Sequence, residues 1–358
     1  MLTNLPSSNK PAMNKLFKIL CFAAASLMLI TPSMAQNRVA TTAAQFLTLG
    51  TGARGMALGH AYTAQATGGD ALFWNPGGAA IPHEGGTLGS VFFTNTQGLV
   101  DVNYNAFAVT IPITQTGVLG ASIGMLDYGR MDVRTVDRPE GVGQTFGAKD
   151  IVVGVSYAQP LTDAFYIGGT VKAIQQTIWD MRAQTMAVDI GFVLQTNYFN
   201  GLRVAASIMN FGGKMQMAGI NNQVFIDFDP TGSGSNDAIP ARIETSRWDL
   251  PLSFRFGLAM PLYRSEYATL ELYSDAHQTN DNDLNSDLGA QLRLSVRRVH
   301  LDARVGYKDL GVQNVDNHLA FGTGLNLHFG STGVGFDYAY VPFDLLGNTQ
   351  TFDVRIFF

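Results

Sequence analysis

The last eight residues of the chain, 351–358, alternate strictly between two kinds of side chain. On a β-strand, one face would carry Phe352, Val354, Ile356 and Phe358, and the other would carry Asp353 and Arg355. Successive side chains of a strand point to opposite faces, so this strand has one apolar and one charged side. Such a strand, with an aromatic residue at its end, is typical of the closing strand of an outer-membrane β-barrel, which separates lipid from the lumen.

The same period-2 pattern recurs along the chain after residue 87. Apolar residues fill alternate positions within 252–260, 288–296, 301–307 and 319–329. Strands are predicted at 87–95, 103–113, 116–127, 149–160, 164–177, 182–197, 200–212, 248–261, 266–277, 285–297, 299–308, 316–329, 331–340 and 348–358. Short turns alternate with longer loops, notably 128–148 and 213–247. The fold class indicated is all-β: a transmembrane antiparallel β-barrel of about 14 strands.

Charged residues within the predicted strands distinguish this barrel from a soluble β-sandwich, which would show the same alternation. Four consecutive strands would place five of them on the inner face: Arg255, Glu271, Arg293, Asp302 and Arg304. Unpaired charges are costly in a dry core, whereas a wet lumen accommodates them. On the lipid face each arginine would cost about 2–4 kcal/mol at the membrane midplane. We therefore expect these five side chains to point inward and to form a cross-strand ionic network.

Residues 1–35 read as an export signal peptide, with Met13 as a possible true start. Lys15 and Lys18 precede an apolar stretch from Ile19 to Ile30, and small residues flank the expected cleavage site after Ala35. A single transmembrane helix is disfavoured because the stretch is shorter than the roughly 20 residues that span a bilayer. The only cysteine, Cys21, would be lost on cleavage. The predicted location is the outer membrane of a diderm bacterium.

The composition excludes several other classes of protein. The chain is 46% hydrophobic but only 14% charged, which is too few charges for a large soluble protein. A net charge of −5 provides no basic surface for nucleic acid. The remaining segment, residues 36–86, does not alternate and is rich in Gly and Ala. We expect it to be a plug or hatch in the mouth of a barrel formed by 87–358, with a loose tail as the alternative.

Several short motifs carry a family resemblance. In the plug segment they are Gly52-Ala53-Arg54-Gly55, Met56 to Gly59, Ala61 to Ala64 and Trp74-Asn75-Pro76; near the other end they are Asp337 to Phe343 and Leu346 to Thr349. Together they resemble the N-terminal signature and the final hairpin of the PorV/PorQ family of FadL-like outer-membrane barrels. His60, where the family usually has Gly, and residues 67–70 depart from the pattern. These departures affect the subfamily more than the fold.

The resemblance implies a barrel of about fourteen strands with an N-terminal plug. It also implies a non-enzymatic component of type IX protein secretion, or a shuttle that carries cargo to the cell surface. The expected partners are outer-membrane lipid, secretion cargo and machinery proteins, and the barrel assembly machinery, which would read Phe358 as an insertion signal. The alternative is a FadL-like channel for the uptake or export of small hydrophobic compounds. A purely structural barrel is a third interpretation.

Other short motifs do not indicate a binding or catalytic site. Residues 50–55 fit G-x-G-x-x-G but lie in no βαβ unit. Asp281, Asp283, Asn285 and Asp287 are spaced like calcium ligands, but Ser286 and Leu292 stand where such a loop needs Gly and Glu, so a solvated acidic loop is favoured. The histidines show no ligand spacing, and His318 and His328 are expected to face the lumen singly. No nucleophile motif is present, so neither catalytic residues nor metal or cofactor sites are predicted.

Overall fold

The computed structural model describes residues 41–98, 102–113, 117–227, 238–310, 318–343 and 347–358. The predicted signal peptide, residues 36–40 of the predicted plug, Leu346 and part of the 213–247 loop lie outside these ranges. Among the described residues, no helix is both long and apolar enough to cross a lipid bilayer.

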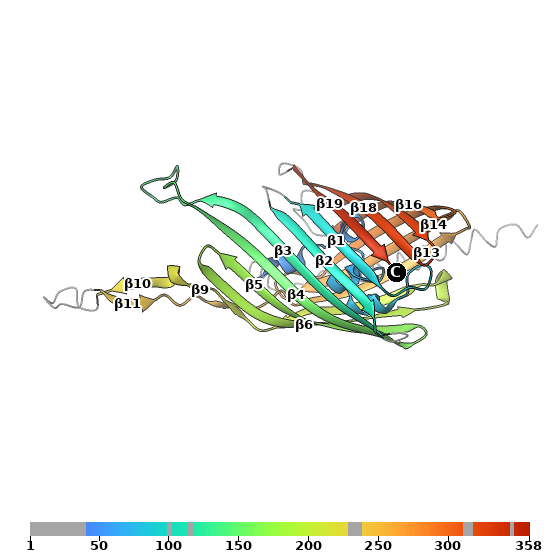
Figure 1. The fold of residues 1–358 in the computed structure, drawn as a ribbon, viewed down its shortest axis with the longest axis horizontal. Helices are drawn as coiled ribbons and strands as arrows, with labels where there is room; N and C mark the ends of the chain where they lie inside the picture. Colours follow the sequence, from blue (N-terminus) through green and yellow to red (C-terminus); the bar gives the residue numbers. More distant parts are fainter. Residues whose placement is uncertain (1–40, 99–101, 114–116, 228–237, 311–317, 344–346) are drawn as a thin grey trace, which may run out of the picture.

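Fourteen antiparallel strands form one closed barrel, in which each strand pairs with the next along the chain and β1 pairs with β19 (Figure 1). The two-residue strand β9 only extends the edge of β6. The barrel strands are β1 (Ser90–Gln97), β2 (Asn103–Pro112), β3 (Val118–Asp132), β4 (Thr145–Thr162), β5 (Phe165–Ile178), β6 (Met181–Gln195), β7 (Arg203–Gly212), β13 (Ser253–Arg264), β14 (Ala268–Thr279), β15 (Asn285–Val296), β16 (Val299–Leu310), β17 (Leu319–Phe329), β18 (Thr332–Phe343) and β19 (Gly347–Phe357). The predicted strand number is confirmed.

The two ends of the barrel differ in their connections. One end, called here the short-turn end, holds the connections 163–164, 265–267, 297–298 and 330–331 together with Phe358. The other, the long-loop end, holds 213–252, and its β3–β4 loop is shorter than predicted because both strands extend to 132 and 145. A two-residue turn at 179–180 also lies there, so the predicted alternation of turn lengths is incomplete.

The 213–252 connection contains several short elements. They are β8 (Met215–Gln216), β9 (Ala218–Gly219), the 3-10 helix η5 (Ile220–Asn222), β10 (Gln223–Ile226), β11 (Ile239–Arg242) and β12 (Arg247–Trp248). The β10–β11 hairpin projects well beyond the barrel (Figure 1). At the short-turn end, the 3-10 helix η4 (Tyr198–Asn200) joins β6 to β7.

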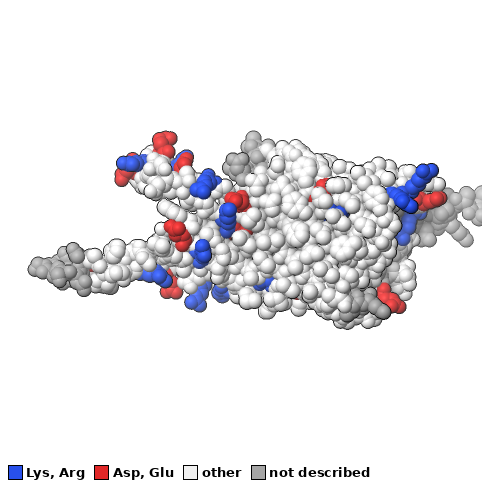
Figure 2. Space-filling model, viewed as in Figure 1, with Lys and Arg blue, Asp and Glu red and all other residues white. Residues whose placement is uncertain are grey.

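The predicted faces of the last strand are confirmed. Phe352 is 47% exposed and Phe358 is 46% exposed, whereas Asp353 and Arg355 are each 3% exposed. The same division holds on the neighbouring strands, where apolar residues such as Leu301 and Phe321 face outward. Charged side chains on the visible face gather at the two ends and leave a central surface nearly free of charge (Figure 2). This band suits a barrel that meets lipid on its outer face.

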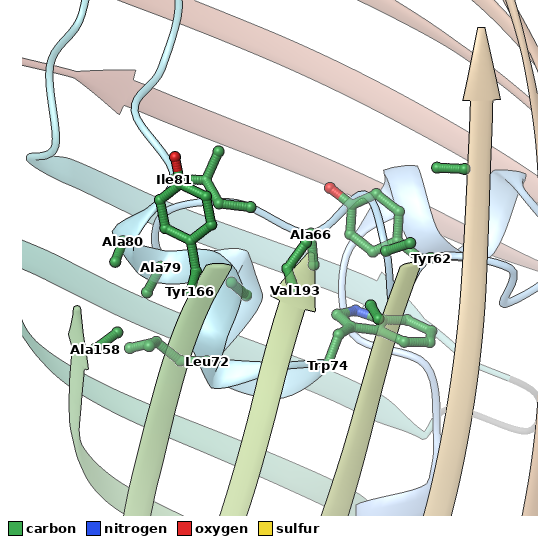
Figure 3. Packing of buried hydrophobic residues seen from close by; sticks show 14 of the residues in the cluster. Tyr62, Ala66, Leu72, Trp74, Ala79, Ala80, Ile81, Ala158, Tyr166 and Val193 are labelled. Carbon is green, nitrogen blue, oxygen red and sulfur yellow. The ribbon is translucent and has the colours of Figure 1, made fainter. Parts of the chain in front are cut away.

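Residues 41–80 fill the inside of the barrel, and residues 81–89 lead from them to β1. Residues 41–80 form η1 (Gln45–Thr48), the α-helix α2 (Ala53–Ala57), η2 (Asp70–Phe73) and η3 (Pro76–Ala80). Helix η3 packs on β4, β5 and β6, and α2 packs on β16 to β19. Nearly every residue from 51 to 80 is buried, and Tyr62, Leu72 and Trp74 form a core with side chains of the wall (Figure 3). This segment is a plug, and it is called so below.

Small residues allow the plug to approach the wall closely. Gly59 has a φ of +64°, and a Cβ built on the facing Gly306 would lie 2.0 Å from the backbone nitrogen of Gly59. Only glycine fits on either side of such a contact. Acidic residues of the wall then accept hydrogen bonds from the backbone of the plug: Asp353 from Ala53 (2.6 Å) and Asp275 from Thr63 (2.9 Å). These bonds satisfy buried N–H groups at the start of α2 and in the turn at Thr63.

Candidate functional site

A cavity of about 340 Å³ lies between the plug and the wall of the barrel. Its apolar lining residues are Leu47, Leu49, Phe73, Trp74 and Met209. Its polar lining residues are Gln45, Thr48, His60, Asn210, Ser253, Arg255, His277, Thr279, Asp281, Asn282, Asn285, Lys308 and Asp309. The volume is at the lower end of the range of small-molecule sites. An amphipathic occupant, with an apolar body and a polar group, matches this mixed lining.

A β-bulge shapes the wall beside this cavity. The pairing of β6 with β7 shifts register between Val188 and Ile190, and Asn210 has a φ of +64°. As a result two successive side chains, Met209 and Asn210, are both buried inside the barrel. Asp189 supports the bulge by accepting a 2.7 Å hydrogen bond from the backbone nitrogen of Asn210. Bulges often redirect side chains in this way next to binding sites.

Lys172 on β5 completes this support. Its ammonium group lies 2.8 Å from Asp189 Oδ2 and also donates to the side-chain oxygen of Asn210. Asn210 in turn donates to the carbonyl of Pro251 at 2.9 Å. Since Lys172, Asp189 and Asn210 are all buried, the bulge is held by a closed set of charge-assisted hydrogen bonds.

Two cationic side chains line the cavity: Lys308, which pairs with Asp309 at 3.6 Å, and Arg255. Arg255 points into the lumen as predicted, and its guanidinium carbon lies 5.1 Å from the centre of the Trp74 ring. Its Nη1 atom is buried and has no hydrogen-bond partner among the described residues. Neighbouring His60 contacts the same ring edge-on at 5.5 Å, and burial holds the pKa of His60 well below its usual value. Arg255 can therefore offer a free donor to a bound anion.

The first described residues of the plug cover the cavity at the long-loop end. Thr42 pairs with Asp249 in an isolated β-bridge, and its hydroxyl donates to Asp281 at 2.7 Å. Gln45 also donates to Asp281. Burial raises the pKa of this carboxyl, but the hydrogen bonds from Thr42, Thr279 and Gln45 outweigh burial and bring the pKa below its usual value. The prediction of a solvated loop over 281–287 is wrong, because Asp281 is bound to the plug.

The prediction of a solvated acidic loop is also wrong for Asp287. It is fully buried on β15 and lies 3.0 Å from the Nδ1 atom of His277. Asp309 lies 3.8 Å from the other ring nitrogen of His277. The spacing of acidic residues in the sequence could not show this arrangement, because it requires the register of three adjacent strands.

The residues of the predicted plug motif contact one another and the wall of the barrel. Gly52, with a φ of +91°, precedes α2, and Arg54 is buried 3.9 Å from Asp70. Gly55 faces Trp74, where a Cβ would lie 2.4 Å from the ring. The indole nitrogen of Trp74 donates to the carbonyl of Thr51 at 2.7 Å. Ala53 and Gly59 make the wall contacts described above, and Met56 lines the small cluster around Ala53, Ala57 and Ala339.

Asn75 and Pro76 bind the plug to the wall near the short-turn end. The amide nitrogen of Asn75 donates to the carbonyls of Thr63 (3.1 Å) and Phe192 (3.0 Å). Its oxygen accepts from the backbone of Gly77, so Asn75 caps η3, and Pro76 opens that helix. Phe192 is three residues from the end of β6, so Asn75 is attached to the wall close to the short-turn end.

The predicted ionic network is real but has different members. Arg293 binds Asp302 at 2.7 Å, and Arg304 binds Asp302 (2.6 Å) and Asp337 (2.7 Å). Arg355 joins through Asp337, and Glu84 joins through Arg293 at 2.8 Å. Sequence reasoning missed these three members. Alternation already placed Arg355 inward and could have indicated it.

Arg255 and Glu271 face inward but take part in no ion pair among the described residues. Arg255 contacts Trp74, and Glu271 accepts a 2.5 Å hydrogen bond from the hydroxyl of Tyr273 on its own strand. The prediction that they belong to the network is wrong. Alternation predicts which face of the barrel wall a side chain occupies. The interaction partner of that side chain also depends on the position of the residue along the strand and on its distance from the plug.

The expectation that His328 stands alone is also wrong. Its ring centre lies 4.8 Å from that of His300, and both Nε2 atoms lie close to Glu84. His318 is separate from them, stacked on Tyr307 at 5.0 Å.

Comparison with known proteins identifies solved structures with a similar fold. No family model and no curated protein matches the chain. The monoaromatic hydrocarbon channel CymD superposes with a TM-score of 0.53 at 9% identity, over 86% of this chain and 97% of that one. The toluene transporter TodX of P. putida gives 0.51 at 9% identity, over 84% and 95% of the two chains. A FadL homologue of Pseudomonas aeruginosa gives 0.51 at 11% identity, over 86% and 98%.

The barrel has a FadL-like fold. At these sequence identities the likeness concerns the fold alone. The resemblance to the PorV/PorQ family rests on the sequence motifs.

Proposed function

We propose that this protein is an outer-membrane channel for small hydrophobic compounds that carry a polar or anionic group. The observation that carries the proposal is the cavity between the plug and the wall, which has apolar lining residues and a buried arginine nitrogen without a hydrogen-bond partner among the described residues. The FadL-like fold and the uncharged outer band support placement in the outer membrane. The export signal at 1–35 is part of the same proposal.

A second feature supports a route through the wall. An apolar groove of about 430 Å³ is lined by residues of β6, β7, β13 and β14, among them Phe192, Ile208, Phe254 and Phe256, which are exposed on the outer face. Three of these strands, β7, β13 and β14, also line the cavity on their inner faces. The ladder between β6 and β7 is irregular at the same place. Through this part of the wall, a hydrophobic solute would have a short path between the outer groove and the inner cavity.

Ligand binding tests the proposal. Arg255→Gln removes the cation and keeps a polar side chain, so it should weaken binding of a monoaromatic carboxylate by about tenfold or more, because charged hydrogen bonds contribute about 1.5–3 kcal/mol. Binding of the matching neutral hydrocarbon should change little. Isothermal titration of the folded protein in detergent measures both affinities.

The control for this experiment is Arg264→Gln, an exposed arginine at the short-turn end of the same strand. It should bind both compounds like the wild type. Equal carboxylate affinity for wild type and Arg255→Gln would remove Arg255 from the site, and failure of the wild type to bind either compound would contradict the proposed function.

A component of type IX secretion is the second candidate function. The observation that favours it is the projecting β10–β11 hairpin, where Phe225 is 74% exposed. Exposed apolar side chains beyond the membrane surface are of the kind that partner proteins cover. A folded protein that copurifies from native membranes only while residues 223–242 are present would support this function.

A further inference from the structure

Two histidines and one glutamate meet at the short-turn end, away from the cavity. His300 is the second residue of β16, and His328 is the last but one of β17. Because His300 pairs with Asn326, His328 lies diagonally opposite on the same inner face. Glu84 comes from the segment 81–89, which leads from the plug to β1.

The three donor atoms converge on one point. Glu84 Oε2 lies 3.2 Å from His300 Nε2 and 3.3 Å from His328 Nε2, and all three donor atoms lie within 4.8 Å of one another. Zinc bonds of about 2.0–2.1 Å at tetrahedral angles place neighbouring ligand atoms about 3.3 Å apart. Two of the three separations therefore already match the edges of a zinc tetrahedron.

Surrounding residues hold two of the three side chains, those of His300 and Glu84, in place. The Nδ1 atom of His300 is hydrogen-bonded to Ser295 Oγ at 2.7 Å, which leaves Nε2 directed at the site. The second oxygen of Glu84 accepts from Arg293 at 2.8 Å, and Arg293 is itself neutralised by Asp302. Metal sites in proteins use such outer partners to orient histidine and carboxylate ligands.

The backbone of Glu84 is fixed as well. The carbonyl of Thr87 accepts from His83 at 2.8 Å, and the carbonyl of His83 accepts from Gly86 at 2.9 Å, so Glu84 lies in a hydrogen-bonded turn. The side chains of His300 and His328 are 16% and 21% exposed, and that of Glu84 is 51% exposed. An ion from the solvent at the short-turn end can reach the donors.

We propose that Glu84, His300 and His328 bind a divalent transition-metal ion, with zinc the best match to two imidazoles and one carboxylate. Three protein ligands leave a fourth position for water. The bound ion would link the segment 81–89 to strands β16 and β17 of the wall. This site is independent of the proposed channel function.

Zinc titration of the full chain tests the proposal. The protein is prepared without a histidine tag, folded in detergent, stripped with a chelator and titrated with Zn²⁺ alone against a chromophoric zinc indicator. We expect one Zn²⁺ per chain, and an affinity lowered by about tenfold or more in His300→Gln and in His328→Gln. An excess of Mg²⁺ should not compete, since it prefers oxygen ligands.

His318→Gln is the matched control, because His318 is a half-buried histidine at the opposite end, stacked on Tyr307. It should bind zinc like the wild type. Should a histidine variant fail to fold, judged by heat-modifiable migration on gels, Glu84→Gln at its exposed position tests the same site and should also weaken binding. Absence of zinc binding by the folded wild type, or equal binding by wild type and Glu84→Gln, would overturn the proposal.

Discussion

Asp337→Ala should destabilise the barrel by about 3–5 kcal/mol, the usual cost of removing one partner from a buried ion pair. The Asp337 side chain is 0% exposed and binds Arg304 at 2.7 Å and the Nε atom of Arg355 at 2.9 Å. Its loss leaves Arg355 with no ion-pair partner among the described residues, and Arg304 with Asp302 alone. Denaturant unfolding of the refolded protein in micelles measures the change in free energy.

Asp127→Ala is the control for this prediction. Asp127 pairs with Lys149 at 3.2 Å, but the two side chains are 35% and 54% exposed. Exposed pairs contribute about 0–1 kcal/mol, so this variant should unfold nearly like the wild type. If both variants lost a similar free energy of unfolding, the interior ion pairs would stabilise the barrel no more than an exposed pair does.

Deleting residues 41–80 should turn a closed barrel into an open pore. These residues fill the lumen, and the wall behind them carries polar and charged side chains that water can solvate. Asp275 and Asp353 would lose their backbone donors from the plug, but incoming water replaces them. We expect a stable, much larger single-channel conductance in planar bilayers.

The matched deletion removes residues 223–242, the β10–β11 hairpin, which lies outside the barrel. It should leave the conductance of the wild type unchanged. If the 41–80 deletion also leaves the conductance unchanged while the barrel folds, then the plug does not close the lumen.

Alternation of side chains was enough to predict the barrel, because lipid outside and polar groups inside impose the same period on every strand. It placed Phe352 and Phe358 outward and Asp353 inward, as observed. The Gly and Ala content of residues 36–86 likewise predicted the plug, since backbones as close as those of Gly59 and Gly306 tolerate no side chain.

The sites depend on information that a single sequence does not hold. His300 and His328 meet because of the register of β16 with β17, and Glu84 reaches them only through the path of the plug. Met209 and Asn210 both face the cavity because of a bulge, which breaks the alternation used for prediction. Arg255 was assigned to the correct face but to the wrong partners, because Trp74 of the plug comes within reach.

Uptake of a labelled monoaromatic compound by intact cells tests the channel account most directly. The host is a bacterium with an outer membrane and without its own FadL-type channels, and it produces the wild type or Ser253→Phe, which fills the cavity from a buried position on its wall. Folded protein is matched between strains by heat-modifiable migration. We expect uptake to be several-fold faster with the wild type than with Ser253→Phe or with no channel. Equal uptake in all three strains would contradict it.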